Sequence, residues 1–233
     1  MARVLENSVD EKINSLLDKL VDPKTKSKEY AQVMYALGNE LGLLLLQKID
    51  ASKDKIALAS TVEDADFLGK GIIDVLEQNG KKVLLTVFWN KRFKPNEENN
   101  ITVAPIIKEF HDEGYRNVDT LIIIKSIISN SCVVRTNLTK LIEEVNSGQI
   151  FIAAPVLLRG AINNLEGEFD DEIVKRFDYL YFAEDDKKNK DGFVDPGIGG
   201  DVYKRLGFES QNKKNRFIPQ IVRERRYNQL KIN

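Results

Sequence analysis

Apolar residues recur at helical spacing along the first fifty residues of the chain. Between residues 9 and 20 they fall at positions i, i+3, i+4 and i+7, and this pattern stops before Pro23. Residues 27–49 repeat the pattern over a longer span, with one apolar face. The sequence therefore predicts a helix over residues 9–20 and a longer one over residues 27–49.

Beyond residue 50, short apolar runs alternate with helical patterns. The runs are rich in Val, Ile, Leu and Phe, as buried strands are. They cover residues 55–60, 81–89, 120–126, 149–154 and 177–183. Helices are expected over residues 64–78, 104–113, 134–145 and 156–165. This order predicts an α/β fold, with a mostly parallel sheet covered by helices on both faces.

Two polar segments interrupt this order. Residues 90–101 have few apolar side chains and contain a proline, so they are expected to form a projecting flap. Residues 202–233 hold nine Lys and Arg against two Asp and Glu, although the whole chain has a net charge of only −1. We expect an N-terminal helix over 1–26, a domain over 27–207 and a basic tail over 208–233. The tail either engages nucleic acid or protein or, as we favour, is an exposed terminal helix or subunit contact.

Composition excludes several classes of protein and site. The chain is 42% hydrophobic and has no apolar run long enough to span a membrane, and its charged N-terminus lacks a signal sequence. A cytoplasmic protein is expected.

A single cysteine, Cys132, and a single histidine, His111, exclude an internal disulfide and a cysteine or histidine zinc cluster. We expect His111 on the exposed side of a helix, and Cys132 and Trp89 in the core.

Ligands of parallel sheets bind where loops leave the carboxyl ends of the strands. Four predicted loops qualify, over residues 60–70, 90–100, 125–133 and 153–160. Residues 191–207, DGFVDPGIGGDVYKRLG, add a glycine-rich segment whose backbone can approach a flat ligand closely. The alternative for that segment is a tight surface loop.

The order of these motifs resembles the type I phosphoribosyltransferases, and among them the uracil phosphoribosyltransferases, over about residues 29–207. Ala153, Ala154 and Pro155, with Gly160 after an insertion, are similar to the Ala-Ala-Pro-Glu-Gly motif of that family. Residues 192–199 are similar to its Gly-Tyr-Ile-Val-Pro-Gly-Leu-Gly loop, which holds the pyrimidine. The resemblance implies a group of base-binding residues, namely Asp195, Gly197, Ile198, Gly199, Gly200 and Asp201.

The sequence departs from the family at the third strand. The family has an acidic residue and a Thr-Gly-Gly loop there, and this chain has Lys125, with Ser131 and Cys132 in place of the two glycines. A tight phosphate-binding loop is harder to form without glycines, although hydroxyl groups there can still donate to an anion. The expected phosphate-binding residues are Lys125, Ser126, Ser129, Asn130 and Ser131, together with Lys91 and Arg92 on the flap.

An acidic cluster follows the first strand, where the family receives pyrophosphate. Glu63, Asp64 and Asp66 repel an anion unless Mg²⁺ lies between them, so they are candidate ligands for the magnesium that the resemblance implies. The alternative, which we favour slightly, is that they stabilise the N-terminus of the following helix.

Two functions remain open from the sequence. The first is a phosphoribosyltransferase-like protein that binds a nucleotide, nucleobase or phosphoribosyl ligand and, if active, transfers ribose 5-phosphate to a pyrimidine. The second is an inactive protein of the same fold that serves as a binding or regulatory subunit, with a protein or nucleic-acid partner held by the basic tail. The resemblance also implies a homodimer.

Overall fold

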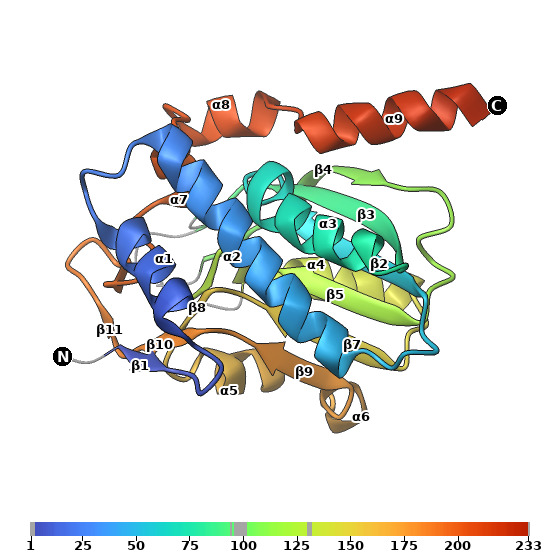
Figure 1. The fold of residues 1–233 in the computed structure, drawn as a ribbon, viewed down its shortest axis with the longest axis horizontal. Coiled ribbons are helices and arrows are strands. Elements are labelled where there is room, and N and C mark those ends of the chain that lie inside the picture. Colours follow the sequence, from blue (N-terminus) through green and yellow to red (C-terminus); the bar gives the residue numbers. More distant parts are fainter. Residues whose placement is uncertain (1–2, 94, 96–101, 130–131, 233) are drawn as a thin grey trace.

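A computed structural model describes residues 3–93, 95, 102–129 and 132–232, and its centre is a six-stranded sheet (Figure 1). The strand order is β4-β3-β2-β5-β7-β9, and every neighbouring pair is parallel except β3 with β4. The strands are β2 (Lys55–Thr61), β3 (Lys82–Asn90), β4 (Ile106–His111), β5 (Thr120–Ile124), β7 (Gln149–Ala153) and β9 (Phe177–Leu180). The predicted mostly parallel sheet is confirmed.

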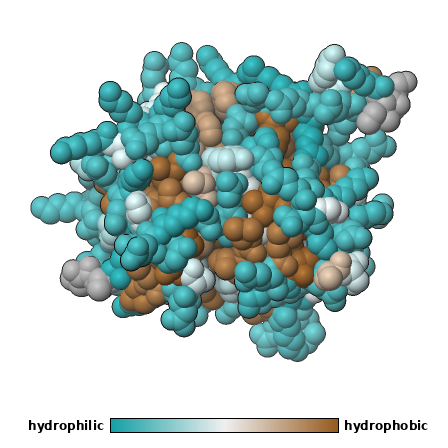
Figure 2. Space-filling view, in the orientation of Figure 1, coloured by the Kyte–Doolittle hydropathy of each residue, from teal (hydrophilic) through white to brown (hydrophobic). Residues whose placement is uncertain are grey.

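Helices cover both faces of this sheet, as predicted. On one face, α1 (Glu11–Val21), α2 (Ser27–Lys48), the π-helical turn η1 (Ala65–Gly69) and α3 (Lys70–Gln78) share a hydrophobic cluster. On the other face, α4 (Cys132–Glu144) and α5 (Ala161–Glu166) share a second cluster, and α6 (Asp171–Val174) follows α5. Figure 2 shows a mainly hydrophilic surface, with apolar residues visible between the polar ones over α2.

The longest helix packs closely against η1 and α3 because of glycine. A Cβ atom on Gly38 of α2 would lie 2.3 Å from the carbonyl oxygen of Leu68, and one on Gly71 of α3 would lie 2.3 Å from that of Tyr35. The two backbones therefore approach to a distance that any side chain at these positions would prevent.

Short strands continue the fold beyond the carboxyl ends of β5, β7 and β9. A four-stranded sheet has the order β1-β10-β8-β6, and a two-stranded sheet joins β11 to β12. The strands are β1 (Val4–Leu5), β6 (Ile127–Ile128), β8 (Val156–Leu158), β10 (Ala183–Asp185), β11 (Lys187–Lys188) and β12 (Val194–Asp195). Of these strands, β6, β11 and β12 lie next to the end of the main sheet where ligands are expected.

The C-terminal segment folds back on the domain. It consists of α7 (Val202–Arg205), α8 (Gln211–Arg216) and α9 (Gln220–Ile232), and Figure 1 shows α8 and α9 along one edge of the molecule. Ile221 and Val222 are buried in the same hydrophobic cluster as α1, α2 and α3. The indole nitrogen of Trp89 donates to the carbonyl of Phe217 at 2.9 Å. The core thus extends through residues assigned to the N-terminal helix and the basic tail.

Three element predictions are wrong. Residues 104–113 were expected to be helical, but β4 pairs antiparallel with β3 at the sheet edge. Residues 156–158 are a strand between β10 and β6, and only α5 after them is helical. The predicted strand 177–183 is divided between the two sheets.

Most of the predicted flap, including residues 94 and 96–101, lies outside the described residues, while Phe93 and Val103 form an antiparallel bridge at its base.

Within the described residues, no helix is both long enough and apolar enough to cross a membrane.

Candidate functional site

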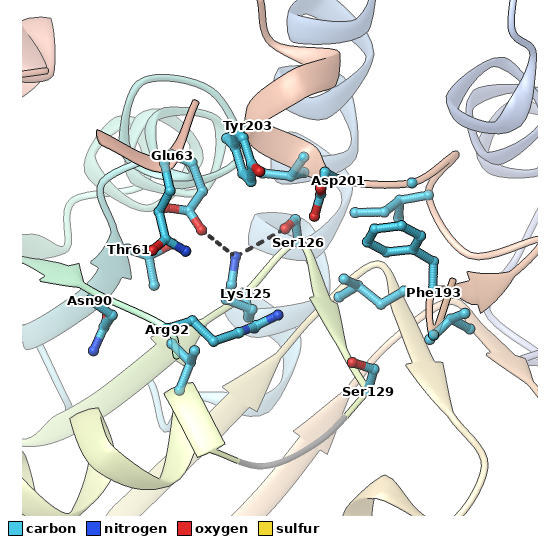
Figure 3. Close-up of a pocket in the computed structure, with 18 of the residues that line it drawn as sticks. Thr61, Glu63, Asn90, Arg92, Lys125, Ser126, Ser129, Phe193, Asp201 and Tyr203 are labelled. Atoms are coloured by element: carbon cyan, nitrogen blue, oxygen red, sulfur yellow. Dashed lines mark hydrogen bonds and ion pairs between the residues drawn. The ribbon is translucent and has the colours of Figure 1, made fainter. Parts of the chain in front are cut away.

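A pocket of about 560 Å³ opens at the carboxyl ends of β2, β3 and β5 (Figure 3). The sheet supplies its floor, residues 191–203 supply one wall, and α8 supplies another. Polar and charged side chains dominate the lining, and these are Thr61, Glu63, Asn90, Arg92, Thr102, Lys125, Ser126, Ser129, Lys188, Asp191, Asp201, Tyr203, Gln211 and Lys214. The pocket lies where the sequence places ligand binding.

Lys125 lies at the centre of the floor, one residue beyond β5. Its ammonium nitrogen is 2.6 Å from Oδ2 of Asp64 and 3.3 Å from Oε1 of Glu63, and it donates to the hydroxyl of Ser126 at 3.2 Å. Thr61 also donates to Oδ2 of Asp64, at 2.6 Å. Figure 3 shows Lys125 pointing to Glu63 and Ser126. The lysine predicted to hold a phosphate is thus held by two carboxylates.

A second lysine reaches the same cluster from the C-terminal segment. Lys214 of α8 has a side chain only 6% exposed, and its ammonium nitrogen lies 3.4 Å from Oε2 of Glu63. The carbonyl oxygen of Asn90, at the end of β3, is also 3.4 Å away. We call Glu63, Asp64, Lys125 and Lys214 the ion-pair cluster. Its two carboxylates and two ammonium groups balance in charge, which a buried site requires.

The charges of the cluster shift the pKa values of Glu63 and Lys125. Burial alone would raise the pKa of Glu63, but the charges of Lys125 and Lys214 outweigh burial and hold this pKa at about 2. Burial would lower the pKa of Lys125, and the charges of Asp64 and Glu63 raise it instead. Glu63 and Lys125 are therefore both charged at neutral pH.

Two other cations line the pocket without compensation. Arg92, beyond the end of β3, and Lys188 of β11 are exposed, and neither makes an ion pair within the described chain. Figure 3 shows the Arg92 side chain reaching beneath Lys125. Asp191 also lines the pocket, and Asp201 pairs with Lys204 at 3.2 Å. The open side of the pocket therefore has an excess of positive charge.

Of the other expected phosphate-binding residues, Ser126 and Ser129 line the pocket. Lys91 is exposed beside the pocket and is not part of its lining. Asn130 and Ser131 lie outside the described residues.

The glycine-rich loop is only partly turned to the pocket. Ile198, Gly200 and Asp201 line it, whereas Asp195, Gly197 and Gly199 do not. A Cβ atom on Gly199, whose φ is +76°, would lie 2.4 Å from the carbonyl oxygen of Leu20. This glycine therefore permits close packing against the end of α1, and its expected contact with a ligand stays a prediction.

The remaining loop residues hold the loop to the body of the protein. The amide of Gly197 donates to Oδ2 of Asp185 at 2.8 Å, and the hydroxyl of Tyr30 donates to the carbonyl of Ile198 at 3.0 Å. Two aromatic side chains in the same segment, Phe193 and Tyr203, line the pocket and are half-buried. These rings are the flat apolar surfaces available to a ligand.

The three carboxylates after β2 do not come together as a magnesium site. Glu63 and Asp64 face lysines, and Asp66 points away and accepts hydrogen bonds from the amides of Gln220 and Ile221 at 2.8 and 2.9 Å. Nowhere in residues 3–93, 95, 102–129 and 132–232 do three or more His, Cys, Asp or Glu side chains form a group suited to a metal. The donor set present therefore does not fit Mg²⁺. Asp66 instead satisfies the N-terminal amides of α9.

Three isolated residues have structural surroundings. Trp89 and Cys132 are buried, as expected. His111 is not on an exposed helix face, because it lies on β4, where it stacks on Tyr115 with 4.1 Å between ring centroids. Its Nδ1 is 3.1 Å from the Thr86 hydroxyl, and burial lowers its pKa.

The lining residues that sequence reasoning missed include Lys188, Phe193, Tyr203 and Lys214. Phe193 and Tyr203 lie inside the glycine-rich segment, so the segment itself was the available signal. Lys214 is one of many cations in the basic tail, and its charge pattern gives no sign that it is buried.

No family model matches this sequence, and no curated protein matches it. Among solved structures, the AQ2163 protein from Aquifex aeolicus is similar with a TM-score of 0.67 at 14% identity, over 87% of this chain and 97% of that chain. This similarity shows that the two share an α/β fold.

Two weaker matches illustrate how other structures compare. A hypoxanthine phosphoribosyltransferase from Staphylococcus aureus has a TM-score of 0.43 at 15% identity, over 63% of this chain and 72% of that chain. A hypothetical protein from Neisseria gonorrhoeae with bound ppGpp has a TM-score of 0.44 at 11% identity, over 78% and 91%. Both are too distant to bear on function.

Proposed function

We propose that this protein binds a phosphorylated ligand of the nucleotide or phosphoribosyl class in the sheet-end pocket. The observation that supports this most is the composition of the pocket walls. Arg92 and Lys188 offer positive charge that no ion pair with a described residue neutralises, and Phe193 and Tyr203 offer aromatic surface, around a volume of about 560 Å³. Cations suit phosphate groups and aromatic faces suit a planar base, so the two together fit a nucleotide.

The residues at the floor of the pocket favour ligand binding without catalysis. In the resembling family an acidic residue at the end of the third strand helps to position ribose hydroxyls. Here Lys125 takes that position, and the two nearest carboxylates are committed to lysines. Both carboxylates of the ion-pair cluster are thus paired with lysines, and neither is a free acid like that of the family. A binding or regulatory protein is therefore favoured over an enzyme.

Transfer of ribose 5-phosphate to a pyrimidine is the activity that the resemblance implies. We expect little or no formation of UMP from labelled uracil, phosphoribosyl pyrophosphate and Mg²⁺. Turnover in the ordinary enzyme range of about 1–10³ s⁻¹ would make this protein an enzyme and contradict binding without turnover.

Isothermal titration calorimetry tests the proposal directly, with uracil, UMP, GMP and phosphoribosyl pyrophosphate as probes. We expect heat of binding with at least one phosphorylated probe and a loss of affinity in the double variant Arg92→Ala/Lys188→Ala. Lys175→Ala is the matched control. Lys175 follows directly after α6, is exposed and pairs with Glu172 of that helix, and it does not line the pocket. If no probe binds, or if the double variant binds as well as the unaltered protein, the proposal is contradicted.

A further inference from the structure

A metal–phosphate complex bound at the floor of the pocket would need free carboxylates as metal ligands. A magnesium ion bound by protein prefers six oxygen ligands at about 2.0–2.1 Å, most often including one or two carboxylates and the phosphates of its ligand. The carboxylates near this pocket floor are Glu63 and Asp64, with side chains 12% and 2% exposed. Each is already bound to an ammonium group.

The ammonium group of Lys125 lies where a cation would bridge the carboxylates of Glu63 and Asp64. Its nitrogen contacts one oxygen of each carboxylate, at 3.3 and 2.6 Å, and the hydroxyl of Ser126 at 3.2 Å. Three oxygen atoms from the ends of two adjacent strands, β2 and β5, thus surround one positive charge. A metal ion placed between the same carboxylates would displace the ammonium group or lie against it, and like charges at that separation repel strongly.

Lys214 completes the arrangement from the opposite side. It lies 3.4 Å from the second oxygen of Glu63, which has no hydrogen-bond partner among the described residues. Both oxygens of Glu63 therefore face a lysine. This second contact is made by the C-terminal segment, so the docked α8 helps to keep the site closed to a metal.

We propose that Lys125 stands in the place of a divalent cation, and that the pocket takes its phosphorylated ligand directly, without Mg²⁺. This inference rests on the proposed function, which supplies the phosphorylated ligand, and it adds that the ligand binds without a metal ion. The ammonium groups of the cluster neutralise Glu63 and Asp64, and Arg92 and Lys188 remain to meet the phosphate. Removing Lys125 frees Asp64 and one oxygen of Glu63, which a divalent cation can bind.

The first test is calorimetry of the unaltered protein with UMP and with phosphoribosyl pyrophosphate, each in EDTA and in excess Mg²⁺. We expect the same affinity in both conditions or weaker affinity in Mg²⁺, because free Mg²⁺ competes for the phosphates. A probe that binds only in Mg²⁺, or ten times more tightly in Mg²⁺, contradicts the inference while supporting the proposed function. Absence of binding in both conditions contradicts the proposed function alone, and the second test then decides the inference.

The second test needs no organic ligand. Mn²⁺ is titrated into the protein and free Mn²⁺ is measured by electron paramagnetic resonance. We expect the unaltered protein and the Lys175→Ala control to bind no Mn²⁺ at this site, and Lys125→Ala to gain one bound ion that is lost again in Lys125→Ala/Glu63→Gln. If the unaltered protein binds Mn²⁺ and Glu63→Gln abolishes that binding, the inference is wrong. It is also wrong if Lys125→Ala folds and gains no ion. Should that variant fail to fold, the titration of the unaltered protein still decides.

Discussion

At the scale of single residues, the character of the site depends on which charges are paired. A buried carboxylate is stable only beside a counter-charge or hydrogen-bond donors, and Glu63 has a lysine near each of its oxygens. Lys125 was visible in the sequence as a departure from a family motif. Its partners were not, because Asp64 is 61 residues away and Lys214 belongs to a segment with many other cations. The pairing depends on tertiary structure that charge patterns do not encode.

The lowered pKa of Glu63 predicts how stability depends on pH. Its pKa falls from an ordinary value of 4.5 to about 2 in the folded protein, because Lys125 and Lys214 outweigh the effect of burial. Its contribution is therefore complete above about pH 4.5 and is lost as the pH falls through 2. Urea denaturation across this pH range should show a steeper loss of unfolding free energy in the unaltered protein than in Glu63→Gln. Parallel pH profiles for the two proteins would contradict this pairing.

At the scale of elements, the sequence predicts the helices and the parallel strands well. The central strands are near-continuous apolar runs, and a run of this kind has few alternatives in an α/β fold. β4 was mistaken for a helix because Ile106, Ile107 and Phe110 also suit helical spacing, and its pairing with β3 is a long-range property. β8 is only three residues long, so its pattern could not be told from the start of a helix.

The C-terminal helix α9 is held at its start by a side chain from η1. Asp66 accepts hydrogen bonds from the amides of Gln220 and Ile221, so Asp66→Ala removes the acceptor for two N-terminal amides. We expect a loss of about 0.5–2 kcal/mol in unfolding free energy and faster hydrogen exchange at these two amides. Gln220→Ala keeps both amides and Asp66, and it is the control. Unchanged exchange in Asp66→Ala would show that α9 does not depend on this contact.

The basic charge of the same helix predicts little affinity for nucleic acid. Arg225 is turned to the body of the protein, where it pairs with Asp112 at 3.1 Å and with Glu77 at 2.6 Å. We expect affinity for labelled RNA or DNA no stronger than about 10⁻⁶ M near physiological salt, as for non-specific binding. Fluorescence anisotropy measures it. Nanomolar affinity that disappears in Arg223→Ala/Arg226→Ala would instead make the tail a nucleic-acid surface.

At the scale of the whole molecule, distant segments meet around one pocket. Strands β2, β3 and β5, the glycine-rich loop and α8 all contribute lining residues, and α1 supports the loop from behind. The sequence located the loops at the sheet end and several of their lining residues, including Arg92, Ser126 and Asp201. It could not locate the contribution of α8, because the return of the C-terminal segment is determined by packing of Ile221 and Val222 in the core.

Gly199 joins two of these segments, and its substitution tests their contact. A valine there must adopt a φ of +76° and places Cβ 2.4 Å from the carbonyl oxygen of Leu20, so the loop and α1 must separate. The backbone conformation alone costs about 1–2 kcal/mol. We expect Gly199→Val to lower the melting temperature clearly, whereas the control Gly148→Ala, with no atom within 4 Å of its Cβ, should change it little. Equal melting temperatures would argue against this packing.

A crystal structure of the protein with UMP, grown in EDTA, tests the central claim most directly. The account predicts UMP in the sheet-end pocket, with its phosphate in contact with Arg92 or Lys188 and its base against Phe193 or Tyr203. Lys125 should remain bound to Glu63 and Asp64. UMP bound elsewhere on the molecule, or a pocket that stays empty at a UMP concentration that saturates the protein in solution, would contradict the account.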